Sequence, residues 1–220
     1  MMKKHLPKPA IERLCILYRL CDDLRARAVQ RVSSKVLGQL LGTGSYTIRK
    51  DINYLGEVGD IGSGYSPERL YNRIRFVLGL DKKRSACIVG LGRLGSAILA
   101  YERFADSGFS IVAGFDSNIN KLETIRTTVE LYPAYEIADI VRKKNIEIGV
   151  IAVPASAAQE TADRLIEGGV RAIVNFSPAL FSYDSSRIFV THMDIIREFT
   201  ILSAYMSLGN KDTDTQNERG

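Results

Sequence analysis

Cys87-Ile88-Val89-Gly90-Leu91-Gly92-Arg93-Leu94-Gly95 is the stretch that decides the fold of this chain. A short apolar strand runs directly into a Gly-x-Gly-x-x-Gly turn, and a helical pattern follows at once. An acidic residue, Asp116, ends the next predicted strand, 21 residues after Gly95. Strand, glycine turn, helix and distant acid together predict a dinucleotide-binding turn.

Each residue type in the turn has a physical role. Gly90 allows a sharp turn, Gly92 lets the backbone approach a pyrophosphate, and Gly95 lets the helix pack closely on the sheet. The first amides of the helix and Arg93 would face the phosphates. Asp116 can accept hydrogen bonds from the adenosine ribose and would repel a 2′-phosphate. We therefore expect NADH or NAD⁺ as the cofactor rather than the phosphorylated forms, with Leu91 and Leu94 completing the turn.

Strands and helices alternate from Ser85 onward. The predicted strands are Ala86–Val89, Ser110–Phe115, Ile148–Val153, Ala172–Asn175 and Ile188–Thr191. The predicted helices lie near Leu94–Phe104, Tyr135–Lys144 and Ala157–Gly168. This alternation predicts an α/β fold, a doubly wound parallel sheet with helices on both faces. Residues 117–133 give no clear pattern.

Two further segments lie where ligands of such sheets bind, at the carboxyl ends of strands. Val153 and Pro154 end the third predicted strand, while Asn175, Ser177 and Pro178 end or follow the fourth. We expect them to contact the cofactor or its nicotinamide half. The alternative is that they form ordinary strand-to-helix turns.

Positive charge is concentrated in the first part of the chain. Residues 1–80 hold 14 Lys and Arg against 7 Asp and Glu, whereas the remainder holds 16 against 18. A basic module on a nearly neutral body is typical of a protein that binds a polyanion. A solvated charged surface is the alternative.

The basic module has a helix-turn-helix pattern. Ile11, Leu14, Leu17, Tyr18, Cys21 and Leu24 recur at helical spacing. Ser33-Ser34 caps a short helix with Val36, Leu37, Leu40 and Leu41 inward, and Ser45 caps a helix from Tyr46 to Leu55. The glycine-rich segment 56–65 suits the β-hairpin wing of a winged helix. Pro67 opens one more helix, with Leu70, Ile74 and Leu78 inward.

The second helix of this pair is the candidate recognition helix. Ile48, Ile52 and Leu55 face the core, so the outward residues are Tyr46, Thr47, Arg49, Lys50 and Asn53. Arg49 and Lys50 can pair with guanine or with phosphates, and Lys35 could hold a phosphate. The alternative is a solvated face on a small helical cap.

The last predicted helix, Asp194–Leu208, is apolar nearly all round. Such a helix must be buried on more than one side, and in a small chain we expect its partner to be a second subunit. The polar tail 209–220 is expected to be disordered.

Several classes of protein are disfavoured. No apolar run reaches the roughly 18 residues that span a bilayer, and the start does not read as a signal peptide, so we expect a cytoplasmic protein. Three cysteines make no disulfide framework, and Cys15 and Cys87 are expected to be buried. With only His5 and His192 beside them, no metal site is expected.

No catalytic set is apparent. A dehydrogenase usually needs a proton donor near the substrate carbonyl. His192 comes after the last strand, and Tyr101 has no lysine three or four residues away. We therefore expect no enzymatic activity.

The combination resembles the Rex family of redox-sensing transcriptional repressors over nearly the whole chain. The matching segments are Val32–Gly38, Ile48–Gly56, Gly62–Tyr65, Gly90–Gly95, Ile151–Ala155 and Val174–Pro178. The Arg-Lys-Asp helix followed by a Gly-x-Gly-Tyr wing is more specific than the glycine turn. Through these motifs Ser34 and Tyr65 join the expected DNA-binding residues.

The resemblance implies a homodimer with an N-terminal winged helix, a Rossmann domain and a C-terminal helix that is domain-swapped between subunits. It also implies binding to double-stranded palindromic operator DNA when NADH is scarce, and release when NADH binds. The family's coupling residues map onto Tyr101, beside the nicotinamide, and onto Arg19 and Asp194, which would pair across the dimer in one state.

The chain departs from the family's pattern at three places. Asp60-Ile61 stand where the wing usually carries a basic residue, and an aspartate near phosphates opposes binding. Asp116-Ser117-Asn118-Ile119 replaces the usual Asp-x-Asp-Pro, so the ribose carboxylate is kept but the loop differs. Ser177 replaces the family's usual alanine.

We therefore expect a winged-helix domain at 1–80, a Rossmann NAD(H)-binding domain at 81–193, a dimerisation helix at 194–208 and a tail at 209–220. The expected function is that of an NADH-responsive transcriptional repressor. The alternatives are an NAD-dependent oxidoreductase with an accessory helical domain, and a nucleotide-sensing subunit that docks on another protein.

Overall fold

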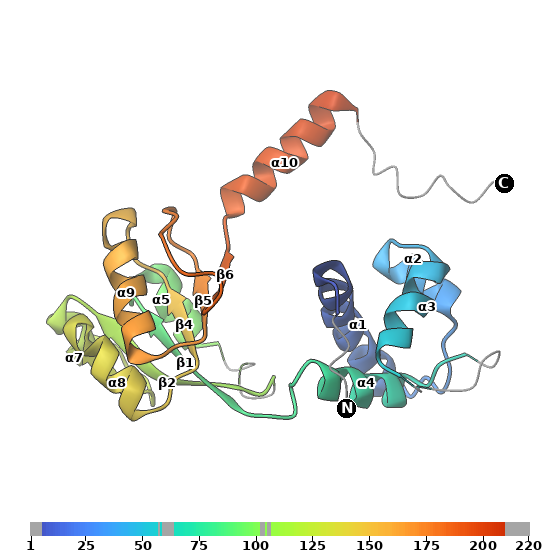
Figure 1. The fold of residues 1–220 in the computed structure, drawn as a ribbon, viewed down its shortest axis with the longest axis horizontal. Helices are drawn as coiled ribbons and strands as arrows, with labels where there is room; N and C mark the ends of the chain where they lie inside the picture. The colour runs from blue at the N-terminus through green and yellow to red at the C-terminus, as the bar shows by residue number, and fades with distance from the viewer. Residues whose placement is uncertain (1–5, 57, 59–63, 102–103, 105–106, 210–220) are drawn as a thin grey trace. The chain divides into compact units, whose positions relative to one another are not determined.

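The computed structural model describes residues 6–56, 58, 64–101, 104 and 107–209, and the chain divides into two compact units. The first extends to Asp81 and the second covers Lys82–Leu208 (Figure 1). None of the helices in the described ranges is long and apolar enough to cross a membrane.

The first unit is helical. Its helices are α1 (Lys8–Ala26), α2 (Ser34–Leu41), α3 (Ser45–Tyr54) and α4 (Pro67–Val77). An isolated antiparallel bridge joins Val32 to Tyr65. The core is apolar and draws on every helix, through Leu14, Leu17, Leu37, Ile48, Ile52, Leu70 and Ile74. Predicted wing residues 57 and 59–63, Asp60 and Ile61 among them, lie outside the described residues.

Local signals set most helix ends in this unit. The Ser33 hydroxyl accepts a hydrogen bond from the Val36 amide at 3.2 Å, as expected of an N-cap. Gly42 ends α2 in the left-handed conformation, with φ of 65°. The prediction that Ser45 caps α3 is wrong, because the N-cap is Gly44 and Ser45 is the first helical residue.

Four apolar side chains predicted to point inward are exposed, Ile11 at 39% among them. Val36 and Leu40 are 43% and 58% exposed, because the eight-residue α2 meets the core through Leu37, Gly38 and the partly buried Leu41. Cys15 is exposed as well. It follows Leu14 by one residue, which turns it about 100° away from the buried face of α1.

The second unit holds a six-stranded parallel sheet in the order β3-β2-β1-β4-β5-β6. The strands are β1 (Arg84–Val89), β2 (Phe109–Asp116), β3 (Leu131–Pro133), β4 (Ile148–Ile151), β5 (Ala172–Asn175) and β6 (Phe189–His192). The helices are α5 (Arg93–Leu99), α7 (Ile119–Thr124), α8 (Ile137–Lys143), α9 (Ala158–Gly168) and α10 (Ile195–Leu208), with short 3₁₀ turns η1 (Ala134–Glu136) and η2 (Ala155–Ala157). β3 and α7 occupy the region in which the sequence showed no pattern.

Both faces of the sheet are covered. Cys87 and Val89 of β1 pack with side chains of α8 and α9, whereas Ile88 packs with side chains of α5 and α7. Alternate residues of one strand thus supply two cores, as a parallel sheet buried on both sides requires. Two predicted bounds are corrected: the helix after the glycine turn ends at Leu99, and β4 ends at Ile151.

Helix α10 has no buried residue. Its exposed apolar side chains include Ile195, Ile196, Phe199, Leu202, Tyr205, Met206 and Leu208. A helix of this length is normally stabilised by burying an apolar face against another element. Because no side chain of α10 is buried, the helix lacks such a partner among the described residues of its own unit. Residues 210–220 of the predicted tail lie outside the described residues.

Candidate functional site

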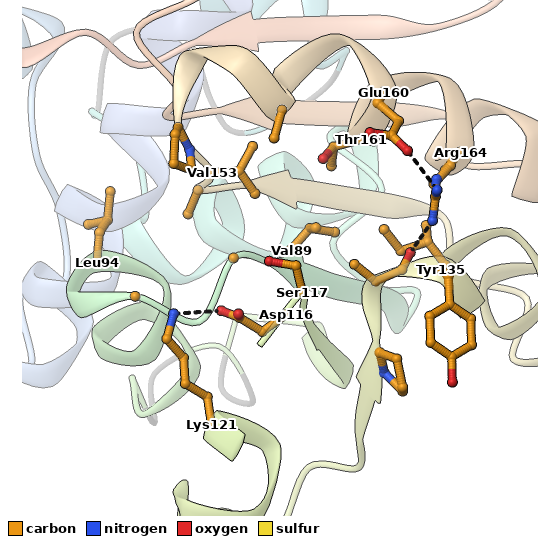
Figure 2. A pocket seen from close by; sticks show the side chains of 18 of the residues that line it. Val89, Leu94, Asp116, Ser117, Lys121, Tyr135, Val153, Glu160, Thr161 and Arg164 are labelled. Atoms are coloured by element: carbon orange, nitrogen blue, oxygen red, sulfur yellow. Dashed lines mark hydrogen bonds and ion pairs between the residues drawn. The ribbon is translucent and has the colours of Figure 1, made fainter. Parts of the chain in front are cut away.

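A cavity of about 790 Å³ opens at the carboxyl edge of the sheet, where β1, β2 and β4 end (Figure 2). The chain leaves β1 toward β2 on one side, and β4 lies on the other, so the cavity sits at the reversal of strand order where such sheets bind ligands. The predicted cofactor residues that line it are Gly90, Gly92, Arg93, Leu94, Asp116, Val153 and Pro154.

The glycine turn forms one wall. Gly90 has a φ of 94°, and a Cβ atom there would lie 2.5 Å from the Ala152 carbonyl oxygen. A Cβ at Gly95 would lie 1.9 Å from the Gly90 carbonyl oxygen, so the helix rests directly on the turn. A Cβ at Gly92 would meet nothing within 4 Å. The turn therefore leaves open space beside Gly92, where the backbone can approach a ligand.

Asp116 is the buried acid of the cavity, 5% exposed at the end of β2. One carboxylate oxygen accepts from the Leu91 amide at 2.8 Å and from Lys121 Nζ at 3.1 Å. The other accepts from the Asn118 amide at 2.8 Å. A carboxylate has about four acceptor positions, so these three bonds leave about one for a ligand.

These contacts also set the charge of Asp116. Burial opposes ionisation, but the hydrogen bonds from Asn118, Lys121 and Leu91 together outweigh it and hold the pKa of Asp116 below its ordinary value of 3.8. The group is thus a carboxylate at neutral pH. Lys121, whose side chain is 42% exposed, partly neutralises it.

The opposite wall comes from α9. Arg164 donates from Nη1 to the Ala134 carbonyl oxygen at 2.9 Å and from Nη2 to Glu160 at 2.6 Å. Thr161, 7% exposed, lies on the same helix and lines the cavity with them (Figure 2). Our sequence reasoning missed this wall and Lys121. The helical periodicity of α9 groups its residues into faces, but it does not indicate which face lies over the carboxyl edge of the sheet.

Six predicted cofactor residues do not line the cavity: Leu91, Gly95, Tyr101, Asn175, Ser177 and Pro178. Asn175 is 1% exposed and uses its amide within the protein, donating to the Ala179 carbonyl oxygen and lying 2.9 Å from His192 Nδ1. Its carbonyl oxygen accepts from the Ser177 amide. In the described structure these residues shape the edge of the sheet.

Tyr101 lies beyond the end of α5, rather than inside that helix as the sequence predicted. It is 53% exposed, and its ring meets Phe104 edge-on, with centroids 5.7 Å apart. Arg19 and Asp194, the other predicted coupling residues, are exposed. The Asp194 carboxylate accepts from the Arg197 amide at 3.2 Å and so caps α10.

Helix α3 presents the candidate DNA-reading face. Its outward residues Tyr46, Arg49, Lys50 and Asn53 are exposed, and Thr47 is half-buried. Arg49 Nη1 donates to the hydroxyls of Ser34 and Ser45, at 3.3 and 3.4 Å. Lys35 is exposed at the start of α2, while Tyr65 is half-buried in the bridge to Val32.

A buried ion pair fixes α3 to α1. Arg13 donates from Nε and Nη2 to the two carboxylate oxygens of Asp51, at 2.6 and 2.9 Å. The Asp51 side chain is 3% exposed and that of Arg13 is 30% exposed. This forked contact sets the rotation of α3 and hence the direction in which Arg49 and Lys50 point.

Within the described ranges no group of three or more His, Cys, Asp or Glu side chains could hold a metal ion.

Comparisons with known proteins match both units. A family model described as "CoA binding domain" matches residues 81–179, and one described as "Putative DNA-binding protein N-terminus" matches residues 5–53. A relative from Carboxydothermus hydrogenoformans, named "Redox-sensing transcriptional repressor Rex", is 35% identical over 90% of this chain and 95% of its own. One of the same name from Syntrophomonas wolfei is 37% identical over 94% and 98%.

Solved structures agree. A crystal structure of a protein named RSP, in complex with β-NAD⁺ and operator DNA, superposes with a TM-score of 0.87 at 32% identity, over 94% of both chains. RSP in complex with β-NADH superposes with a TM-score of 0.82 at 31% identity, over 93% of this chain and 95% of that one.

Proposed function

This chain belongs to the Rex family of redox-sensing transcriptional repressors, and on that basis we propose that it binds operator DNA as a homodimer and releases the DNA when NADH binds. The relatives are named as repressors, so the chain is a regulator of transcription and not an enzyme. We propose a cytoplasmic location, where DNA and NADH are both available.

The observation that supports the proposed binding of NADH is the ionised Asp116 beside an open glycine turn. Asp116 forms one wall of the 790 Å³ cavity, and Gly92 leaves space beside it for a pyrophosphate. A ribose diol would donate to Asp116, while a 2′-phosphate would be repelled by it. Arg93 supplies a cation at the same mouth. NADH and NAD⁺ therefore fit this cavity better than their phosphorylated forms.

The observation that supports DNA binding is the exposed basic face of α3, held by the Arg13–Asp51 pair. Arg49 and Lys50 can reach base edges or phosphates, and Tyr46, Thr47 and Asn53 lie along the same side. Ser34, Lys35 and Tyr65 flank this face in the sequence motifs shared with the family. We propose that residues 1–80 bind DNA and that residues 81–193 bind NADH or NAD⁺.

The exposed apolar surface of α10 supports a homodimer. We infer that residues 194–208 pack on a second subunit as an exchanged helix, which would bury the side chains that its own described unit leaves exposed. A two-fold dimer places two copies of α3 one helical turn of DNA apart, about 34–36 Å, and so favours a palindromic site.

NADH can regulate this dimer only if it binds one arrangement of the subunits more tightly than another. We propose Tyr101, Arg19 and Asp194 as the coupling residues, since all three are exposed within their own units. Val153, Pro154, Asn175, Ser177 and Pro178 form the edge of the sheet that the nicotinamide half would reach.

The test starts with duplex DNA selected by the protein from a pool of random palindromes. Binding to the selected duplex is measured alone and with NADH, NAD⁺, NADPH or coenzyme A. Of these four ligands, we expect only NADH to lower the affinity for DNA strongly. With or without ligand, the affinity for DNA should fall steeply as the salt concentration rises, because the protein contacts phosphates. Firm NADH binding with unchanged DNA affinity would contradict the proposal.

Two variants give this test its control. Arg49→Ala should weaken DNA binding by about 1–3 kcal/mol without changing NADH affinity. Lys143→Ala removes one positive charge from the exposed surface of α8, in the other unit, and should leave DNA affinity unchanged. Equal losses in the two variants would mean that net charge, rather than the face of α3, determines binding.

A further inference from the structure

The cavity has a distinct end on the β3 side of the sheet. Asp116 ends β2, and β3 pairs with β2 on the side away from β1. Arg164 of α9 donates to the carbonyl oxygen of Ala134, the residue directly after β3, at 2.9 Å. This bond places one face of α9 over the end of β3. The cavity beyond Asp116 is therefore closed by α9 on one side and β3 on the other.

A bound dinucleotide would place its base in that end. With the pyrophosphate at the glycine turn and the ribose at Asp116, the nicotinamide half extends toward β4 and β5 and the adenine extends toward β3. Its surroundings there are mainly apolar, with Ile119, Pro133, Ile137 and Ala157 among the lining residues. Apolar walls fit a flat purine ring, but they do not satisfy the nitrogen atoms on its edge.

Ser117, Tyr135 and Thr161 bring hydroxyl groups to the cavity, and Thr161 is the buried residue among the three. Thr161 is 7% exposed and lines the cavity from the side of α9 that faces it (Figure 2). Helical threonines usually donate to the carbonyl four residues before them, as Thr124 does to Asn120 at 3.1 Å and Thr200 to Ile196 at 2.9 Å. Among the described residues no such bond, and no other hydrogen bond, is made by the Thr161 hydroxyl. It is a hydroxyl without a described protein partner, on a buried residue that lines the cavity.

A hydroxyl in that position favours a ligand that can pair with it. A ligand that fills this end of the cavity takes the hydroxyl out of water, and a polar atom of the ligand that reaches it replaces the hydrogen bond to water that is lost. A hydroxyl can donate to a ring nitrogen or accept from an amine, and the edge of adenine offers both.

We propose that the Thr161 hydroxyl forms a hydrogen bond with the edge of the adenine base of bound NADH or NAD⁺, and that it is a specificity-determining residue for the adenosine half of the ligand. This inference rests on the proposed nucleotide-binding function. It assigns to α9 the recognition of the base, separate from the recognition of ribose by Asp116 and of phosphate by the glycine turn.

The test uses variants of nearly the same volume. Thr161→Val replaces only the hydroxyl by a methyl group, Thr161→Ser keeps the hydroxyl, and Thr124→Val is the matched control because the Thr124 hydroxyl is satisfied within α7. Affinities are measured by calorimetry for NADH, for ADP-ribose, which keeps the adenosine half, and for reduced nicotinamide mononucleotide, which lacks it.

We expect Thr161→Val to weaken NADH and ADP-ribose alike, by about 3- to 10-fold, because one buried hydrogen bond is lost. Reduced nicotinamide mononucleotide should bind all variants equally. Thr161→Ser should stay within about twofold of the wild type, as should Thr124→Val.

Three results would overturn the inference while leaving the proposed function intact: NADH affinity unchanged in Thr161→Val, Thr161→Ser as weak as Thr161→Val, or an equal loss for the mononucleotide. A wild-type protein that binds neither NADH nor ADP-ribose would overturn the proposed function, and this inference with it.

Discussion

Removing either partner of the Arg13–Asp51 ion pair should destabilise the first unit, but by different amounts. The two partners differ in exposure, 30% for the arginine side chain and 3% for the aspartate. Removing Arg13 leaves a carboxylate buried without a partner, whereas removing Asp51 leaves a guanidinium that can still reach water. We therefore expect Arg13→Met to destabilise the first unit more than Asp51→Ala does.

The size of each loss follows from the same exposures. Breaking a buried ion pair by removing one partner costs about 3–5 kcal/mol, because it leaves a buried charge unpaired. For Arg13→Met we expect a loss of about 3–4 kcal/mol. For Asp51→Ala the loss is that of two charge-assisted hydrogen bonds, about 1.5–3 kcal/mol, toward the lower end because the guanidinium is rehydrated.

Hydrogen exchange of the full chain, read by mass spectrometry, measures both units separately. A loss of 3 kcal/mol should lower the protection of the most stable α1 and α3 amides by about 150-fold, since 1.4 kcal/mol is a factor of ten. The sheet of the second unit serves as the internal control, and its protection should not change. An equal or larger loss in Asp51→Ala than in Arg13→Met would refute the reasoning.

Three other outcomes are expected at the nucleotide site. Gly95→Ala should lower the thermal stability of the chain sharply, because its Cβ would lie 1.9 Å from the Gly90 carbonyl oxygen, whereas Gly92→Ala, with open space around it, should keep the melting temperature and lose only NADH affinity. Lys121→Met removes the cation beside Asp116, so the ratio of NADH to NADPH affinity should increase, and a ratio that falls or stays level would contradict the role of Asp116 in rejecting the 2′-phosphate. The pKa of Asp116 in the folded protein lies below its ordinary value of 3.8. The stabilising contacts of the carboxylate are therefore fully present above pH 3.8 and are lost as the pH falls through the lower pKa of the folded state. We expect the affinity for NADH in an acid titration to stay constant down to about pH 4.

The sequence was sufficient where a residue type has one structural use. Gly90 and Gly95 predicted a turn that no other residue fits, and the buried core of α3 followed from the spacing of Ile48, Ile52 and Leu55. The two-sided burial of β1 followed from the alternation of strands and helices, which predicted a sheet with helices on both faces. These features depend on local geometry, which a sequence records directly.

The sequence was insufficient where short elements or distant contacts decide the outcome. Three residues of β3 and six of α7 are too few to show a period, so the region around Lys121 could not be interpreted. The exposure of Val36 and Leu40 depends on how little of α2 meets the core. Thr161 enters the cavity only because α9 packs over the end of β3, and the Arg164–Ala134 bond that shows this joins residues far apart in the chain.

The order of strands in the sheet has a consequence for how the chain is made. β1 lies between β2 and β4, so the centre of the sheet stays incomplete on a ribosome until Ile148–Ile151 has been synthesised, whereas the helical unit is complete by Val77. N-terminal parts fold first during translation, and helical parts with local contacts fold fastest. The half with the basic face therefore matures while the other half is still being translated. A chain that stops before Ile148 would therefore contain the complete helical unit beside an incomplete sheet.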